Sequence, residues 1–201
     1  MMLSDDLIKA HNDDQEIKNK TYDREIITSE DCYGMEFQNV VFDSCRFIDC
    51  DFNKTSFYSC KFEKCDISNI RFQDSYWKEC KLTGCKGSGT DLSRSTLKNT
   101  VIQNCLFTYT LLSESLIEDS IFKSTDLSNA VLTEVKLRKS KFDNVRLISA
   151  ELFRSPLKGL DLSNCDISGI ILSQSASELR GAKVSYEQAA DIARLLGIII
   201  V

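Results

Sequence analysis

The chain has 201 residues, a net charge of −5 and 42% apolar residues, which is enough apolar content to bury a core. No apolar run approaches the length that spans a bilayer, and residues 1–15 are too polar for a secretory signal, so we expect a cytoplasmic protein without membrane contact. Nine cysteines in such a chain indicate reduced thiols rather than a disulfide framework.

Residues 1–34 form an acidic N-terminal segment. Ten acidic and four basic side chains fall within residues 1–36. The first twenty residues are polar enough to form a loose tail or a short helix. Tyr22, Ile27 and Cys32 already keep the five-residue phase of the segment that follows, which is compatible with an irregular first coil from about residue 22.

A five-residue repeat dominates residues 35–177. Every fifth residue from Phe37 to Leu172 is large and apolar at 27 of 28 positions, Gly87 being the exception. The residue two places before each of these is Cys, Ser, Thr, Ala or Val at 24 of 28 positions. The remaining three positions of each pentapeptide are mostly polar or charged.

This period excludes the ordinary elements. Steps of five scatter the apolar residues around an α-helix, and on a flat strand they alternate between opposite faces. The chain must therefore turn after each pentapeptide, and four right-angle turns close a square coil of about twenty residues whose rungs stack at roughly 4.8 Å. The repeat predicts an all-β solenoid, a quadrilateral β-helix in which Phe57, Leu92 and Leu137 point inward.

Two of the 28 central positions hold residues of unusual volume. Trp77 is too large and Gly87 too small, and because they lie ten residues apart they belong to opposite sides of one coil. Close packing requires such differences to compensate. We therefore predict that the indole of Trp77 covers the backbone at Gly87.

Eight of the nine cysteines occupy the small-residue positions, and Cys45, Cys65, Cys85 and Cys105 fall on one side of consecutive coils. A ladder of thiolates for metal or redox chemistry is one interpretation. The chain has no CxxC pair and no histidine nearby, so we favour buried cysteines that act as small apolar residues. The acidic residues of the repeat lie at outward positions without apolar surroundings that would raise a pKa. We predict no catalytic residue, no metal and no cofactor.

The charge of the repeat is balanced. Residues 37–172 carry 17 acidic and 18 basic side chains, so the acidity of the chain belongs mainly to its N-terminal segment. A strongly acidic rod would favour a mimic of nucleic acid, and a strongly basic one would favour nucleic-acid binding. The balance favours neither, and no direct binding of nucleic acid is expected.

One outward position is apolar in five consecutive pentapeptides. The residue just before the central one is Val101, Leu106, Leu111, Leu116 and then Ile121, a set that we call the girdle. Exposed apolar surface usually marks a contact, which makes the girdle a candidate partner surface. The alternative is that such residues suit a strand and that no single side of the rod carries a large patch.

Residues 178–201 depart from the repeat. Ser185 and Gln188 have the spacing of a capping box, and residues 189–196 then carry an apolar stripe that Gly197 ends. Residues 198–201 are all apolar, which predicts a terminal strand. Because solenoids need covered ends, this segment is expected to close the coil, to pair with a second subunit, or both. The predicted dimer interface consists of Ala189, Ile192, Leu195, Leu196, Ile198, Ile199, Ile200 and Val201.

Stretches such as Thr-Asp-Leu-Ser-Asn at 125–129 and Leu-Asp-Leu-Ser-Asn at 160–164 resemble the A(D/N)LxX unit of the pentapeptide-repeat family. The resemblance covers about residues 35–175 and implies a right-handed quadrilateral β-helix. Residues 179–184 (Leu-Arg-Gly-Ala-Lys-Val), Gln188, residues 195–198 and Val201 look like the tail of the quinolone-resistance subfamily. That likeness implies a tail-to-tail homodimer, with the outline of duplex DNA, that binds DNA gyrase or topoisomerase IV and reduces quinolone action. An interaction scaffold with another protein partner is the alternative.

Overall fold

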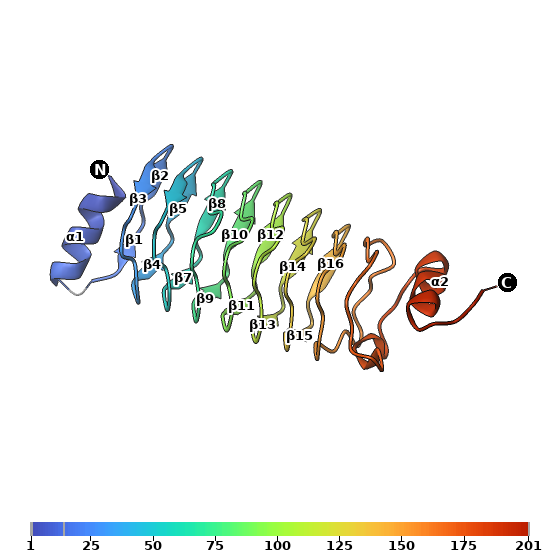
Figure 1. Cartoon of the computed structure of the whole chain (residues 1–201). Helices are drawn as coiled ribbons and strands as arrows, with labels where there is room; N and C mark the ends of the chain where they lie inside the picture. The colour runs from blue at the N-terminus through green and yellow to red at the C-terminus, as the bar shows by residue number, and fades with distance from the viewer. Residues whose placement is uncertain (1, 14, 201) are drawn as a thin grey trace.

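The computed structural model describes residues 2–13 and 15–200, which form an elongated rod of stacked coils with a helix at each end (Figure 1). Helix α1 (Leu3–Asp13) lies at the N-terminal end, and helix α2 (Tyr186–Leu195) lies at the other. A short 3₁₀ helix, η1 (Ser177–Leu179), precedes α2. The predicted all-β solenoid is therefore confirmed, with a helix at each of its ends.

Parallel strands of two or three residues line three sides of the rod in the described part of the chain. One seven-stranded sheet contains β1 (Ile17–Lys18), β4 (Glu36–Gln38), β7 (Ser56–Tyr58), β9 (Tyr76–Lys78), β11 (Thr96–Lys98), β13 (Leu116–Glu118) and β15 (Lys136–Arg138). The second contains β2 (Thr21–Asp23), β5 (Val41–Asp43), β8 (Lys61–Glu63), β10 (Lys81–Thr83), β12 (Val101–Gln103), β14 (Ile121–Lys123) and β16 (Lys141–Asp143). The pair β3 (Ile26–Thr28) and β6 (Arg46–Ile48) starts a third side, which isolated bridges continue.

The register confirms a coil of twenty residues. Phe37 pairs with Phe57, Phe42 with Phe62, and Leu82 with Ile102. The central residues of the 28 pentapeptides, Gly87 included, are buried except for Leu137 and Leu172, which are partly exposed. Phe57 and Leu92 thus lie inside, as predicted, whereas Leu137 is only partly enclosed.

A left-handed backbone residue makes most corners. The residue two places after the central one has a positive φ in nearly every pentapeptide, for example 53° at Asn39 and 52° at Ser59. L-residues with side chains seldom adopt this conformation. The N–H of Asn39 donates to the carbonyl of Tyr58 on the next coil at 2.8 Å, and this bond recurs along the rod, so the stacking stabilises the corner.

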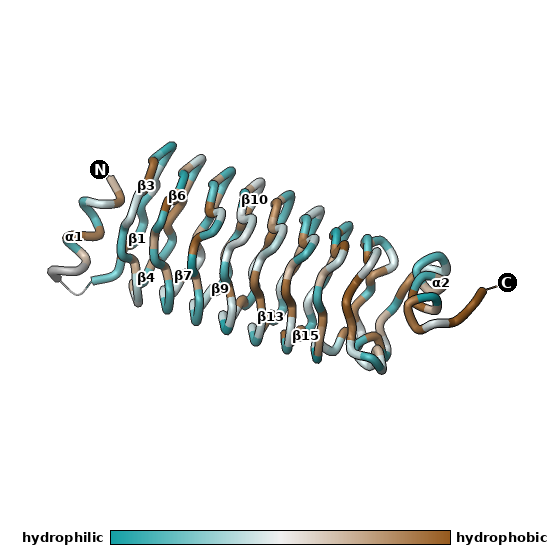
Figure 2. Tube along the Cα trace, in the orientation of Figure 1, coloured by the Kyte–Doolittle hydropathy of each residue, from teal (hydrophilic) through white to brown (hydrophobic). Residues whose placement is uncertain are grey.

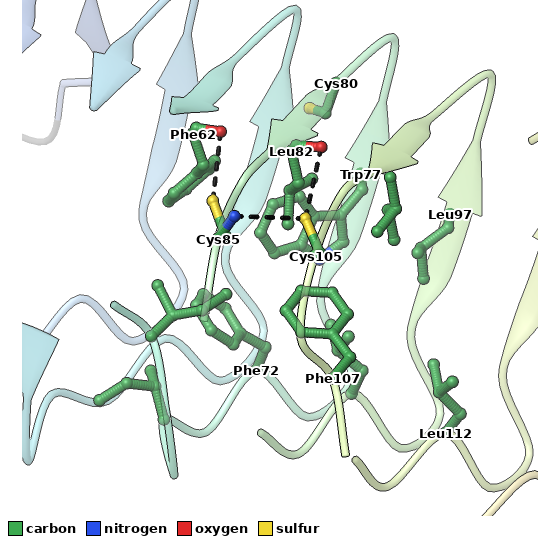
Figure 3. Close-up of a cluster of buried hydrophobic side chains, with 14 of the residues drawn as sticks. Phe62, Phe72, Trp77, Cys80, Leu82, Cys85, Leu97, Cys105, Phe107 and Leu112 are labelled. Carbon is green, nitrogen blue, oxygen red and sulfur yellow. Dashed lines mark hydrogen bonds between the residues drawn. The ribbon is translucent and has the colours of Figure 1, made fainter. Parts of the chain in front are cut away.

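The small-residue positions supply hydrogen bonds as well as space. The Cys85 thiol donates to the carbonyl of Phe62 at 3.3 Å, and the Thr90 hydroxyl donates to the carbonyl of Ile67 at 2.8 Å. Figure 3 shows this bond for Cys85 and the longer one, 3.6 Å, between Cys105 and the Leu82 carbonyl. Most of the Cys, Ser and Thr residues at this position likewise donate to the preceding coil, a contribution that the prediction of simple small apolar residues missed.

The predicted contact of Trp77 with Gly87 is wrong. Trp77 stacks on Phe57 with ring centroids 4.1 Å apart, and its Nε1 donates to Ser75 Oγ at 2.8 Å. A Cβ placed at Gly87 would lie 2.0 Å from Cε1 of Phe107, which belongs to the next coil. The aromatic stack of the preceding coils holds the indole, and the Phe107 ring fills the space that Gly87 leaves.

The first coil and α1 close the N-terminal end. The coil begins at Ile17, which pairs with Phe37, five residues before the start near residue 22 that the sequence suggested. Leu3, Leu7 and Ala10 of α1 are buried over this coil. The open end of the core is therefore covered.

A buried carboxylate fixes α1 to the first coil. Asp6 is 7% exposed and accepts hydrogen bonds from Tyr22 Oη at 2.9 Å and Lys20 Nζ at 3.1 Å. Burial opposes ionisation of Asp6, but these two donors outweigh it and lower the pKa of the carboxyl.

Stacking is interrupted on two sides after β15 and β16. In most coils the residue before the central one donates its backbone N–H to the preceding coil, as Glu151 does to Ala130 at 2.9 Å. Pro156 occupies this position and has no N–H to donate to the Val135 carbonyl. On these two sides, residues 156–164 keep only their forward backbone bonds between coils, such as those from Leu157 to Glu178 and from Leu162 to Lys183.

The interruption explains the partial exposure of Leu137. In Figure 1 the chain after β16 carries no strand arrow, and β15 and β16 are the last strands of their sheets. Leu137 and Ser140 therefore lack the next coil that covers the equivalent residues elsewhere, and both are partly exposed.

Candidate interaction surfaces

Helix α2 is tied to the end of the rod by its capping box. Ser185 Oγ accepts from the N–H of Gln188 at 3.3 Å, and the Gln188 side chain accepts from the N–H of Ser185 at 2.7 Å, which confirms the predicted capping box. The same side chain donates to the carbonyls of Leu162 at 2.9 Å and Cys165 at 2.7 Å. Gln188 therefore both starts the helix and docks it on the last coil.

The apolar face of α2 is largely uncovered. None of the residues Tyr186–Leu195 is buried, and Ala189, Leu195 and Leu196 of the predicted interface are exposed. Ile192 is partly buried and lies with Leu195 in a groove of about 200 Å³ between the helix and the last coil. The helix thus covers the end of the rod loosely and leaves apolar surface facing outward.

The tail beyond Gly197 extends away from the rod. Ile198, Ile199 and Ile200 are exposed, Ile199 by 86%, and Figure 2 shows them as an apolar segment that leaves α2. Residues 198–200 form no strand, so the terminal strand is not formed within the chain, because no neighbouring strand lies beside them. Val201 lies outside the described residues.

A buried carboxylate stabilises the turn into this end. Glu178 of η1 is 3% exposed and accepts from the N–H of Arg154 at 3.0 Å and from Ser173 Oγ at 2.8 Å. Burial opposes ionisation, yet the backbone N–H groups and the Ser173 hydroxyl lower the pKa of Glu178. No motif in the sequence distinguished this residue from the many exposed acids.

The girdle residues do not share one side of the rod. Val101 and Ile121 pair on the sheet of β12 and β14, whereas Leu106, Leu111 and Leu116 each lie on a different side. Val101, Leu116 and Ile121 are partly buried, while Leu106 and Leu111 are 43% and 38% exposed.

Tyr109 adds to the exposed part of the girdle. It occupies the left-handed corner between Leu106 and Leu111, with φ 58°, and is 63% exposed. Leu106, Tyr109 and Leu111 therefore form an apolar corner on two adjoining sides. The sequence signal was an aromatic residue at a position that is otherwise mostly polar.

Charged side chains pair between coils along the outside. Arg94 Nε lies 2.8 Å from Asp74 Oδ1, and Arg154 Nη1 lies 2.8 Å from Glu134 Oε1, each pair twenty residues apart. Exposed pairs of this kind contribute little stability individually. Their regular spacing explains why the repeat carries nearly equal numbers of acids and bases.

Two models of one sequence family match the chain. A model described as a pentapeptide repeat region matches residues 55–118, and a model described as pentapeptide repeats in eight copies matches residues 110–147 and 130–169. Together with the observed coils, these matches decide the family. The chain belongs to the pentapeptide-repeat proteins.

Solved structures of other pentapeptide-repeat proteins align at low identity. A trypsin-treated variant of QnrB1, a plasmid-mediated fluoroquinolone resistance protein, is 16% identical with a TM-score of 0.41, over 91% of this chain and 100% of that one. HetL from the cyanobacterium Nostoc sp. strain PCC 7120, involved in heterocyst differentiation regulation, is 14% identical with a TM-score of 0.36, over 91% and 94%.

A third aligned structure covers less of both chains. Rfr23 from the cyanobacterium Cyanothece 51142 is 23% identical with a TM-score of 0.36, over 52% of this chain and 64% of that one. No curated protein sequence matches this pentapeptide-repeat protein.

The cysteines and the acidic residues are the candidates for reactive or metal-binding groups. All nine cysteines are free and buried, and burial raises the pKa of Cys50 and Cys165. Among residues 2–13 and 15–200, no three His, Cys, Asp or Glu side chains are grouped to hold a metal ion. Neither helix of this part of the chain is long and apolar enough to cross a membrane.

Proposed function

We propose that this pentapeptide-repeat protein is a non-enzymatic binding rod that acts as a homodimer and engages a type II topoisomerase, DNA gyrase or topoisomerase IV. The observation that carries the proposal is the uncovered apolar end: α2 buries none of its residues and Ile199 is 86% exposed. Exposed apolar surface of this extent usually marks an interface. A second copy docked on the same end would cover it.

The topoisomerase is proposed from the residues that position this end. Residues 179–184 and Gln188 carry the resemblance to the quinolone-resistance subfamily. The Gly181 carbonyl accepts a hydrogen bond from the N–H of Gly159 at 2.8 Å, and the backbone of Lys183 forms a β-bridge with that of Asp161. The Gln188 side chain docks α2 on the last coil. The resemblance thus lies in residues that set the direction of α2, which supports a shared arrangement of the dimer.

The proposed dimer can be tested by introducing negative charge into the C-terminal tail. Sedimentation equilibrium of the wild type should give a dimer, and Ile198→Glu together with Ile199→Glu should give a monomer, because two carboxylates would be buried in the interface. Ile26→Glu is the matched control, since Ile26 is 66% exposed at the other end of the rod. A doubly substituted chain that stays dimeric would refute the tail as the interface.

The partner can be tested with purified gyrase. Supercoiling is measured with ciprofloxacin, with increasing amounts of wild-type protein, and with the monomeric variant at the same concentrations. The proposal predicts that the wild type restores or inhibits supercoiling and that the monomer has a weaker effect. If the wild type does neither, gyrase is excluded, and the same assay with topoisomerase IV decides the remaining case.

A scaffold for another protein is the second candidate function. It is favoured by the exposed corner of Leu106, Tyr109 and Leu111, which the dimer does not use. Leu106→Glu with Leu111→Glu should abolish binding to such a partner, whereas Ile26→Glu should not. If the double variant keeps the full effect on a topoisomerase, the corner is not the surface that contacts the enzyme.

A further inference from the structure

A cleft opens in the side of the rod next to the unpaired edge of β16. It has a volume of about 840 Å³ and lies between β16 and the segment 159–164. Ser140 and Phe142 line one wall, and Gly159, Asp161 and Ser163 line the wall across from it. One end is limited by the hydrogen bond from Asn164 Nδ2 to Asp143 Oδ1, 2.8 Å.

The edge facing the cleft has free backbone groups. In the coils where stacking continues, the N–H of the central residue donates to the next coil, as Leu132 does to Glu151 at 2.7 Å. Within residues 2–13 and 15–200, no backbone hydrogen bond joins β15 or β16 to residues 156–164. The N–H groups of Leu137 and Phe142 therefore have no backbone acceptor in the described part of the chain, and Phe142 lines the cleft; such an edge is a template for an added strand.

The same edge is the most basic stretch of the chain. Lys136, Arg138, Lys139 and Lys141 are four cations within six residues, and all four are exposed. None of the four forms an ion pair among the described residues, in contrast to the paired cations of the preceding coils. Lys139 and Lys141 line the cleft, together with Lys123, which pairs with Asp143 at 3.5 Å.

We propose that this cleft binds an extended acidic peptide segment of a partner protein, which adds as a strand to β16 and places its carboxylates beside Lys139 and Lys141. Side chains alternate along a strand, so the peptide residue opposite Phe142 points inward and its two neighbours point outward. The fitting sequence therefore alternates acidic and apolar residues. The phosphates of a nucleic-acid duplex could pair with the lysines, but a duplex has no row of peptide groups that could hydrogen-bond to the edge of β16.

Fluorescence anisotropy tests the proposal with a labelled nine-residue peptide of alternating glutamate and valine and the full-length protein. Two comparison peptides have the same length: one alternates lysine and valine, and one has glutamates with N-methylated valines. Only the first peptide should bind, because binding requires both the carboxylates beside Lys139 and Lys141 and an unmodified backbone that can lie flat against the edge. Equal binding of the N-methylated peptide, or no binding of the first, would overturn the proposal.

Matched variants distinguish binding in the cleft from non-specific electrostatic attraction between the peptide and the protein. Lys139→Glu with Lys141→Glu should weaken peptide binding roughly tenfold or more, since two attractions become repulsions. Lys61→Glu with Lys81→Glu is the control, because these lysines hold the same register on β8 and β10 within the paired sheet. Equal weakening in both variants would refute a specific site. So would binding of a duplex oligonucleotide through Lys139 and Lys141 by a protein that ignores the peptide.

Hydrogen exchange provides the structural readout. The amide of Phe142 should exchange quickly in the free protein and slow at least tenfold with the peptide bound, whereas the amide of Leu82, already within the ladder, should not change. A Phe142 amide that is fully protected without peptide would show that the cleft is closed and would overturn the proposal.

Discussion

Filling the gap in the central apolar positions at Gly87 should destabilise the protein. The repeat alone predicts the opposite, since every other central residue from Phe37 to Leu172 is large and Gly87→Ala moves toward the pattern. In the structure, however, the methyl group that this substitution adds would lie 2.0 and 2.2 Å from two ring atoms of Phe107. Real Cβ contacts are not shorter than 3.0 Å, so the ring or the coil must shift.

The expected cost follows from the confinement of the ring. Phe107 is 1% exposed, so it cannot turn away into solvent. Overpacking of a core costs about 1–3 kcal/mol, and this contact belongs at the upper end, so we expect a loss of about 3 kcal/mol. Phe107→Leu removes the ring, and in that background Gly87→Ala should cost less than about 1 kcal/mol, a coupling of about 2 kcal/mol.

Urea unfolding followed by circular dichroism measures both effects. Gly34→Ala is the control for glycine removal as such, since Gly34 has a φ of 67° and nothing lies within 4 Å of its added Cβ. It should lose about 1 kcal/mol from the left-handed backbone alone. A Gly87→Ala protein that is as stable as the wild type, or a cost that is unchanged by Phe107→Leu, would refute the assignment of Phe107 as the filling residue.

Three further substitutions test the hydrogen bonds of the core and the two ends. Thr110→Val removes the hydroxyl that donates to the Gly87 carbonyl at 3.1 Å and should lower the free energy of unfolding by about 1 kcal/mol in the same urea assay. Tyr22→Phe leaves the buried Asp6 with one donor fewer and should lower it by about 1–3 kcal/mol at pH 7. Glu178 has a pKa lowered from 4.5, so its charge stabilises the fold above pH 4.5 and this contribution is lost as the pH falls through the folded-state pKa. Stability measured from pH 7 to 3 should therefore fall less in Glu178→Gln, which starts lower by about 1–2 kcal/mol, and identical pH profiles would contradict this role.

The coil could be predicted from sequence because its cause is periodic. Central residues such as Phe57 and Leu92 must share one interior, and only a turn after each pentapeptide achieves this. The contact between Gly87 and Phe107 could not be predicted in the same way. It depends on which ring of a neighbouring coil leans toward the gap, and this is a matter of side-chain rotamers rather than of position in the repeat.

One residue, Pro156, indicated the cleft in the sequence, but this could be recognised only once the hydrogen-bond pattern between coils was known. Pro156 is the only proline of the chain and stands at an outward position of its pentapeptide. The structure shows that the N–H of this position donates to the preceding coil, so a proline there breaks the ladder. Likewise, the tail at 198–200 was predicted to be a strand on its apolar composition, but a strand requires a neighbour that a single chain does not supply.

The two ends of the rod bear on how copies of it can associate. At the N-terminal end, α1 covers the core with the buried Leu3 and Leu7, and although the single side chains of Met2 and Ile8 stay exposed, Asp6 is satisfied by Tyr22 and Lys20. At the other end, α2 buries none of its residues. A head-to-tail contact would need an apolar surface at both ends and would continue into a filament, whereas contact between two identical apolar ends closes after two copies. The asymmetry therefore favours a dimer with its N-terminal ends outward, and growth into filaments at high concentration would show that this argument is wrong.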